Sequence, residues 1–300
     1  MKVGFELTQR GADANPDAIL ELAQLGEDLG YDSLWANDHV VIPREVRTPY
    51  PYGATGRHPF AQDVPYLEGL TVLAFVAGWT RRLGLGISVL ILPQRNPVLA
   101  AKVAASLDVL SKGRLILGVG SGWLAEEFEA LDMPFAQRGA RTDEFLRVMK
   151  ALWTEDHPRF QGRFYTLEDV IFYPKPVQKP HMPLWIGGEA NGALRRAAAL
   201  GDSYHPADRG LEPFEKVAER YKRVQELARG YGRDPSSIEF TLRTTVNFAR
   251  DGVPAVVRRF QEYRQAGVAH VLASFQPATL EAVREGMTLF AREVRPALAS

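Results

Sequence analysis

The sequence predicts one α/β domain over residues 1–300, folded as a (β/α)8 or TIM barrel. A length of 300 residues suits such a barrel, and the apolar runs at 83–92, 115–119 and 184–186 are continuous rather than alternating. Continuous apolar strands are typical of a parallel sheet buried on both faces. About eight strand-then-helix units follow one another, beginning near Lys2, Ser33, Leu83, Arg114, Pro183, Ser203, Ile238 and His270. A doubly wound open sheet is the alternative architecture.

Helix beginnings are marked by a polar residue before a proline. In the pairs Asn15–Pro16 and Asn96–Pro97 the asparagine can cap the first turn, and the proline fits where no N–H is needed. Glu212–Pro213 and Val253–Pro254 open two later helices in a similar way. One apolar face then recurs at helical spacing in the first helix, formed by Ile19, Leu22, Ala23, Gly26 and Leu29.

Helix ends are marked by glycine, with a short apolar strand directly after it. Glycine accepts the left-handed conformation that ends a helix, and a short turn then returns the chain to the sheet. We identify this pattern at Gly30, Gly84, Gly113, Gly201 and Gly267.

Two stretches interrupt the alternation of strands and helices. Residues 43–65 are rich in Pro, Gly, Tyr and Arg, and residues 155–182 contain several prolines with strand-like pieces near Phe160 and Phe172. Both are long enough to be insertions. In a barrel we expect them at the C-terminal face, where substrates are held.

The composition excludes several classes of function. The 36 basic and 36 acidic side chains give a formal net charge of zero, which disfavours nucleic acid or an anionic membrane as the main partner. No cysteine is present, so disulfides, thiolate catalysis and cysteine-bound zinc are excluded. With neither a signal peptide nor an apolar run of about 18 residues, the sequence predicts a cytoplasmic protein without a membrane segment.

The glycine-rich segment 118–122 ends a predicted strand and resembles a nucleotide-binding loop. A dinucleotide fingerprint needs another glycine three positions after Gly120, but Trp123 stands there. The glycines then serve either tight turns or close approach of the backbone to a flat ligand. The six histidines are far apart in the sequence, so we expect no metal site.

Asn37, Asp38 and His39 directly follow the second predicted strand. One interpretation is a capping Asp38 with a structural histidine beside it. The other is that Asp38 orients His39 for proton transfer or charge stabilisation. Their position at the end of a barrel strand, where catalytic residues of barrels lie, favours the second interpretation.

A second candidate is the pair Gly187–Gly188, followed by Asn191, which can open a helix over residues 192–200. These residues either turn the chain or form a site for a phosphate or a ring edge. Aromatic side chains in or near the loops are candidates for the walls of a pocket, among them Trp123, Tyr52 and Phe172.

An ordered set of motifs gives the sequence a family resemblance over about residues 3–205. The set comprises residues 35–39 (WANDH), 88–97 (SVLILPQRNP), 101–102 (AK), 107–114 (LDVLSKGR), 118–123 (GVGSGW), 138–139 (RG), 143–144 (DE), 152–153 (LW), 176–180 (PVQKP) and 186–188 (IGG). Together they resemble the bacterial luciferase-like monooxygenase family, especially its branch of oxidoreductases that depend on the deazaflavin coenzyme F420.

The resemblance implies a barrel that holds a flavin or deazaflavin across the C-terminal ends of its strands. It implies that Asp38 and His39 lie near the reactive edge of the ring, with His39 and Asp38 as catalytic residues. Ser88 and Val89 would form a bulge beneath the ring, often with a non-proline cis peptide bond. The resemblance further implies cofactor contacts from Ser121, Gly122, Gly187 and Gly188. From the residues themselves, Asn191 at the helix start and Arg209 as a basic group are added as cofactor-binding candidates.

One departure from the branch concerns Trp123. In its sugar-phosphate dehydrogenases a carboxylate follows the Gly-x-Gly turn, and Trp123 replaces it here. Acid catalysis by that carboxylate therefore does not transfer to this chain. The tryptophan suggests a more apolar or aromatic substrate.

Three functions follow from these observations. The first is an oxidoreductase that passes hydride between coenzyme F420 and a small organic substrate. The second is an FMN-dependent monooxygenase that uses oxygen and a flavin reductase partner, and the third is a non-catalytic flavin-binding barrel. The resemblance also implies a homodimer.

The tail of the cofactor favours the first function. F420 carries a polyanionic lactyl-glutamate chain that FMN lacks, and basic residues at the mouth of the pocket would hold it. The candidates are Arg57, Lys175, Lys179 and Arg209. At any single position an ordinary solvated charge is the competing interpretation.

Overall fold

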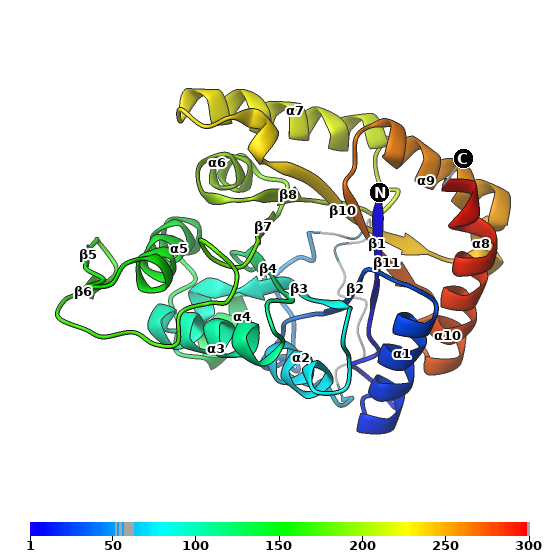
Figure 1. Ribbon diagram of the computed structural model, residues 1–300, viewed down its shortest axis with the longest axis horizontal. Coiled ribbons are helices and arrows are strands. Elements are labelled where there is room, and N and C mark those ends of the chain that lie inside the picture. Colours follow the sequence, from blue (N-terminus) through cyan, green and yellow to red (C-terminus); the bar gives the residue numbers. More distant parts are fainter. Residues whose placement is uncertain (52, 54–55, 57–62, 299–300) are drawn as a thin grey trace.

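Eight parallel strands close into a barrel in the computed structural model, which describes residues 1–51, 53, 56 and 63–298 (Figure 1). Strand β11 pairs with both β1 and β10, which closes the ring. The strands are β1 (Lys2–Glu6), β2 (Ser33–Ala36), β3 (Gly84–Ile91), β4 (Leu115–Gly120), β7 (Leu184–Gly187), β8 (Ser203–His205) continued by β9 (Ala207–Asp208), β10 (Glu239–Val246) and β11 (His270–Phe275). The predicted (β/α)8 fold is confirmed, and each predicted strand start lies within one residue of the observed one.

Helices surround the barrel on all sides in Figure 1. The long helices are α1 (Pro16–Asp28), α2 (Gly69–Ala77), α3 (Pro97–Leu110), α5 (Arg138–Thr154), α6 (Asn191–Leu200), α7 (Phe214–Gly230), α9 (Val253–Gln265) and α10 (Leu280–Leu289). Two short helices, α4 (Ala125–Ala130) and α8 (Phe248–Asp251), follow β4 and β10. Short 3-10 turns are formed by Leu92–Gln94, Pro235–Ser237 and Pro296–Leu298, and Phe290–Val294 form a π-helix. No helix in the part of the chain that the structure describes is both long and apolar enough to cross a membrane.

The expected helix signals are present except at Gly84 and Gly201. Gly84 is the first residue of β3 and lies well after the end of α2 at Ala77, so it does not end a helix. Asn15 and Asn96 accept N–H groups of the first turns of α1 and α3. Gly30 has a φ of +74°, as expected for a left-handed helix end. Gly201 instead has a φ of −83°, and a Cβ there would lie 2.7 Å from Ile186 Cγ1. Close packing of α6 on β7, and not backbone conformation, explains this glycine.

The inside of the barrel is filled by an aromatic cluster at its centre. The Trp35 and Trp185 rings lie 4.7 Å apart, and Trp35 donates to Ser33 Oγ at 2.7 Å. Gly86 allows this packing, because a Cβ there would lie 2.2 Å from the Trp35 ring. His205 stacks on Trp35 at 5.6 Å. The barrel is therefore packed at its centre, and the space above this cluster lies toward the C-terminal ends of the strands.

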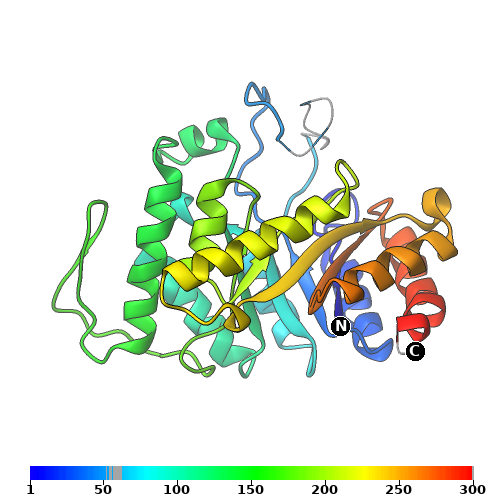
Figure 2. The same cartoon turned by 90° about the horizontal axis from the view of Figure 1, so that it is seen from above.

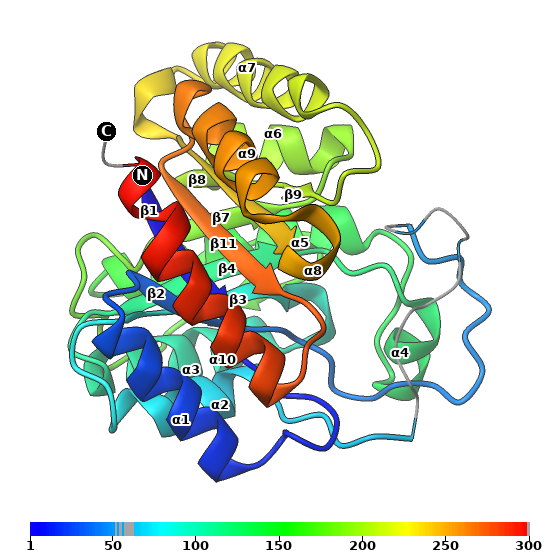
Figure 3. The same cartoon turned by 90° about the vertical axis from the view of Figure 1, so that its right-hand side faces the viewer.

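The two insertions have different positions. Residues 43–65 follow β2, and their described part lies beside α4 at the C-terminal ends of the strands (Figure 3). Residues 155–182 follow helix α5 and precede β7, and they contain the hairpin of β5 (Phe160–Gln161) and β6 (Thr166–Leu167). Glu144 of α5 accepts the Tyr165 N–H, and Asp108 of α3 accepts the Val177 N–H. This segment packs on the outside of α3 and α5, so its expected position at the C-terminal face is wrong.

Candidate active site

A cavity of about 1120 Å³ opens at the C-terminal ends of the strands. Its volume lies slightly above the usual range of about 300–1,000 Å³ for small-molecule sites, which leaves room for a cofactor and a substrate together. Figure 2 shows the loop after β2, in blue, and the short helix α4, in green, projecting from one side of the barrel. Among the site residues expected from the sequence, those that line the cavity are Asp38, His39, Ser88, Val89, Ser121, Gly122, Trp123, Gly187, Gly188 and Arg209.

The carboxylate that orients His39 is Glu127 of α4. His39 Nδ1 lies 3.0 Å from Glu127 Oε2, and Glu127 Oε1 accepts the Val40 N–H at 2.7 Å. Glu127 is 1% exposed, so its charge is held in a nearly dry environment. Although burial opposes ionisation, the hydrogen bonds from His39 and Val40 keep the pKa of Glu127 below its ordinary value. Glu127 was not among the site residues expected from the sequence, because no local spacing connects it to His39.

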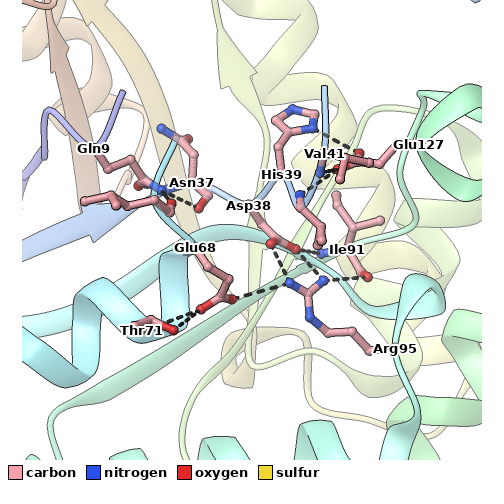
Figure 4. Close-up of polar contacts among 12 residues, drawn as sticks. Gln9, Asn37, Asp38, His39, Val41, Glu68, Thr71, Ile91, Arg95 and Glu127 are labelled. Carbon is pink, nitrogen blue, oxygen red and sulfur yellow. Dashed lines mark hydrogen bonds and ion pairs between the residues drawn. The ribbon is translucent and has the colours of Figure 1, made fainter. Parts of the chain in front are cut away.

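Asp38 has a different partner and does not orient His39 (Figure 4). Its two carboxylate oxygens accept from Arg95 at 2.6 and 2.8 Å, and one of them also accepts the Ile91 N–H at 2.7 Å. Burial raises the pKa of the Asp38 carboxyl, and the Arg95 guanidinium and the Ile91 N–H oppose that rise. Asp38 therefore fixes the end of β3 to the end of β2, and the expected Asp38–His39 pair is replaced by two separate pairs.

Glu126, next to Glu127, fixes the loop that follows β2. Its carboxylate accepts the N–H groups of Arg47 and Thr48 at 2.7 and 2.9 Å and the Thr48 hydroxyl at 2.8 Å. Burial opposes ionisation, but these hydrogen bonds and the helix N-terminus lower the pKa of Glu126 to about 2. The two glutamates of α4 thus hold residues 39–48 over one side of the cavity.

A second polar network lies at the floor of the cavity. Arg243 of β10 donates to Glu6 of β1 at 2.7 Å and to Asn37 Oδ1 at 2.9 Å, and Asn37 also donates to Glu6. Burial raises the pKa of Glu6, but the charge of Arg243 and the hydrogen bonds of Ser274 and Asn37 lower it by more. The pKa of Glu6 is therefore below its ordinary value. This network joins strand ends that are far apart in the sequence, and no motif predicted it.

Ser88 and Val89 form the expected bulge of β3. The register between β3 and β4 shifts between Ile87 and Leu90, and the Ser88–Val89 peptide bond is cis. The Ser88 hydroxyl lies 3.1 Å from His205 Nε2. Burial lowers the pKa of His205 to about 3, so this imidazole is neutral at physiological pH.

The glycines of the opposite wall bring the backbone close to the cavity. Gly188 has a φ of +111°, and Gly122 has a φ of +75° with a would-be Cβ 2.7 Å from Ile91 Cγ2. Helix α6 begins at Asn191 with Ala190 as its N-cap, and Asn191 is exposed and absent from the cavity lining. Asn191 opens the helix as expected, as its first residue, while Gly192 and not Asn191 lines the cavity.

The aromatic candidates divide into three cases. Trp123 lines the cavity and packs edge-to-face on Tyr50 at 5.1 Å. Phe172 is buried outside the barrel beneath Lys102, and it does not reach the cavity. Tyr52 lies outside the described residues.

The basic candidates for an anionic tail divide similarly. Arg209 lines the cavity and pairs with Glu189 at 3.3 Å. Lys175 donates to the carbonyls of Leu152 and Glu155 at the end of α5, and Lys179, in the same segment, is absent from the cavity lining. Arg57 lies outside the described residues. Arg138 at the start of α5 and Arg196 within α6 also line the cavity, and neither was among the basic candidates expected from the sequence.

The family model for luciferase-like monooxygenases matches residues 1–297. The chain belongs to the luciferase-like monooxygenase family. The resemblance seen in the sequence is thereby confirmed at the level of the family.

Curated relatives of this luciferase-like protein include proteins named for different cofactors. An uncharacterized protein of Mycobacterium tuberculosis is 34% identical over 257 residues, which are 86% of this chain and 84% of that protein. An F420-dependent glucose-6-phosphate dehydrogenase of Kineococcus radiotolerans is 30% identical over 85% of this chain and 71% of the relative. An FMNH2-dependent dimethylsulfone monooxygenase of Pseudomonas putida is 31% identical over 64% of this chain and 49% of the relative.

Solved structures with this luciferase-like fold are similar over nearly the whole chain. The monooxygenase RslO1 of Streptomyces bottropensis has a TM-score of 0.79 at 20% identity, covering 99% of each chain. An F420-dependent secondary alcohol dehydrogenase has a TM-score of 0.80 at 18% identity, covering 99% of this chain and 98% of the other. At these identities the likeness concerns the fold.

The residues of this luciferase-like protein that the structure describes contain no group of three or more His, Asp or Glu side chains suited to a metal ion. The polar groups of the cavity are instead arranged as pairs and short networks. The chemistry that this arrangement supports is hydrogen bonding and proton transfer around a bound organic molecule.

Proposed function

We propose that this luciferase-like protein is an oxidoreductase that binds coenzyme F420 and a small organic substrate in the barrel cavity. The observation that carries the proposal is the pair of His39 and Glu127 at the rim of a cavity of about 1120 Å³. A histidine held by a buried carboxylate beside a large cavity is suited to proton transfer.

The residues present fit a flat ring with an anionic tail. Gly122 and Gly188 keep the wall clear of side chains, and Gly192 has open space where a Cβ would be. The Thr8 Oγ1 hydroxyl, in a residue that lines the cavity, has no hydrogen-bond partner among the described residues. A bound polar ligand would complete such a site. When bound, F420 supplies a hydride donor or acceptor.

Each part of the chain has a defined task in the proposal. Glu127 binds His39 at Nδ1, and Nε2 is the nitrogen that we assign to proton exchange with the substrate. Asp38 acts through Arg95 and holds the strand ends rigid. Arg138, Arg196 and Arg209 would attract the anionic part of the cofactor.

The second candidate is an FMN-dependent monooxygenase that receives reduced FMN from a flavin reductase. Similarity to the FMNH2-dependent monooxygenase of Pseudomonas putida supports this candidate. A non-catalytic flavin-binding barrel is the third. For all three we propose a cytoplasmic protein that works on small molecules, and a homodimer.

Titration of the purified protein with F420 and with FMN tests the cofactor. We expect F420 to bind more tightly, with an affinity that falls as salt rises, because its tail is held by charge. If FMN binds at least tenfold better or copurifies stoichiometrically, the monooxygenase replaces the F420 oxidoreductase. Steady-state turnover with either cofactor distinguishes an enzyme from a binding protein.

A further inference from the structure

The Arg243 guanidinium is fixed from three directions at the floor of the cavity. Nη2 donates to Glu6 Oε2 at 2.7 Å, and Nη1 donates to Asn37 Oδ1 at 2.9 Å and to the Ser88 carbonyl at 3.2 Å. The three acceptors come from β1, from the end of β2 and from β3. A guanidinium held by three separate strand ends has one orientation and needs no rearrangement when a ligand binds.

Arg243 has hydrogen-bonding capacity that these contacts do not use. A guanidinium has five N–H groups, and the three bonds occupy one on Nη2 and both on Nη1. The N–H on Nε and the second N–H on Nη2 make no hydrogen bond to another described residue. The side chain is 28% exposed and lines the cavity. A ligand in the cavity can therefore meet unused, oriented donors.

The charge of Arg243 is compensated by an acid. Glu6 pairs with Arg243 at 2.7 Å, and Asp38 of the neighbouring strand end pairs with Arg95 at 2.6 Å. A carboxylate or phosphate on the ligand would meet the Glu6 charge beside Arg243. A neutral oxygen acceptor avoids that repulsion and still accepts a charge-assisted hydrogen bond.

An aromatic wall lines the same cavity as Arg243. Trp123 and Tyr50 pack edge-to-face at 5.1 Å, and both line the cavity. Flat apolar molecules pack well on such a wall.

We propose that Arg243 is a specificity-determining residue, which binds the neutral carbonyl or hydroxyl oxygen of an aromatic substrate. The proposal rests on the proposed function, because it needs the cavity to take an organic substrate beside the cofactor. It assigns the substrate oxygen to the floor of the cavity and the aromatic body to the wall of Trp123.

The test compares two probes that differ only at the oxygen, acetophenone and ethylbenzene, by calorimetric titration of the intact protein. We expect acetophenone to bind about tenfold more tightly than ethylbenzene, and benzoate to bind no more tightly than acetophenone. Arg243→Met should abolish the preference for acetophenone. Because this change removes the ion-pair partner of Glu6, the double variant with Glu6→Gln and Arg243→Met is measured alongside.

Arg220→Met is the matched control. Arg220 is 25% exposed and also paired with a glutamate, Glu212, but it does not line the main cavity. This variant should keep the full preference for acetophenone. An equal preference in Arg243→Met, no binding of acetophenone to the natural protein, or stronger binding of benzoate would each overturn the proposal.

The same variants are titrated with F420 and FMN, which separates this inference from the proposed function. We expect Arg243→Met to change cofactor affinity less than threefold. A loss of tenfold or more would mean that Arg243 binds a ring oxygen of the cofactor, and would overturn the assignment to substrate. If neither cofactor binds the natural protein, the proposed function fails while the preference for acetophenone is still measured.

Discussion

Glu127 and His39 are 88 positions apart in the sequence, and their side chains meet at 3.0 Å at the rim of the barrel. The contact joins the loop after β2 to α4, the short helix after β4. The same carboxylate accepts the Val40 N–H, so one buried group orients the imidazole and fixes the backbone that carries it. Such a partner is what a proton-transfer histidine needs to keep one tautomer and one orientation.

Replacement of His39 tests its role in proton transfer. We expect His39→Ala to lower turnover by about 10²-fold or more, because proton-transfer groups typically raise the rate by a factor of about 10²–10⁴. Cofactor affinity should stay within a few-fold of the natural value. Glu127→Gln should give a smaller loss of turnover, since the hydrogen bond is kept and the charge is removed. His157, an exposed histidine outside the cavity, supplies the control His157→Ala. Unchanged turnover in His39→Ala with a confirmed substrate would contradict the assignment.

The stability of the protein should depend on the charge of Glu126. Its pKa is about 2 in the folded protein against 4.5 ordinarily, so its stabilising effect is complete above about pH 4.5 and is lost as the pH falls toward 2. We expect Glu126→Gln to lower the free energy of unfolding by about 1–2 kcal/mol at pH 7, and by less at pH 3. Urea unfolding at both pH values measures this difference.

Glu129→Gln is the control for that experiment. Glu129 is in the same helix, but its side chain is 66% exposed and contacts only Arg47, at 3.2 Å, among the described residues. We expect this change to lower the free energy of unfolding by no more than a few tenths of a kcal/mol at either pH. An equal loss in both variants would mean that the general charge of α4, and not the anchoring of the loop, is responsible.

Substitutions at Gly188 and Gly192 distinguish a role in the backbone turn from a role in ligand binding. At Gly188 a side chain is strained by a φ of +111° and would meet Ala193 Cβ at 3.1 Å, so Gly188→Val should lower both the melting temperature and cofactor affinity. At Gly192 a Cβ meets no atom within 4 Å, and the residue lies in the first turn of α6. Gly192→Ala should keep or raise the melting temperature and weaken cofactor binding several-fold. Unchanged cofactor affinity would show that the α6 N-terminus does not contact the ligand.

The expected homodimer has a candidate surface on α2 and α3. Exposed apolar side chains occur on both of these neighbouring helices and in the turn after α2, including Phe75, Trp79, Leu99 and Leu110. Exposed apolar surface is typical of interfaces between subunits. We expect the double change of Trp79→Ser and Leu110→Ser to give a monomer in light scattering after gel filtration.

Tyr231→Ser is the matched control for the interface, because Tyr231 is 50% exposed at the end of α7, on the other side of the barrel from α2 (Figure 1). This variant should keep the oligomeric state of the natural protein. A natural protein that is monomeric at all concentrations would refute the homodimer.

The sequence by itself determined the barrel, because its signals are local. Continuous apolar runs, Asn15 and Asn96 as caps, and glycines such as Gly30 act over a few residues, so strand starts were predicted to within one residue. The position expected for residues 155–182 was wrong. The face of the barrel at which an insertion lies depends on whether it follows a strand or a helix, and this one follows helix α5.

The pairing of side chains at the site was decided only by the tertiary structure. Because Asp38 and His39 are adjacent in the sequence, Asp38 was expected to orient His39. In the folded chain Asp38 pairs with Arg95, and His39 pairs with Glu127. Arg243 meets Glu6 across 237 positions of sequence. Closure of the ring brings the C-terminal ends of all its strands to one cavity, and residues on neighbouring strand ends can be anywhere in the sequence. The sequence therefore located the rim of the barrel, and the closed ring selected which charges face one another there.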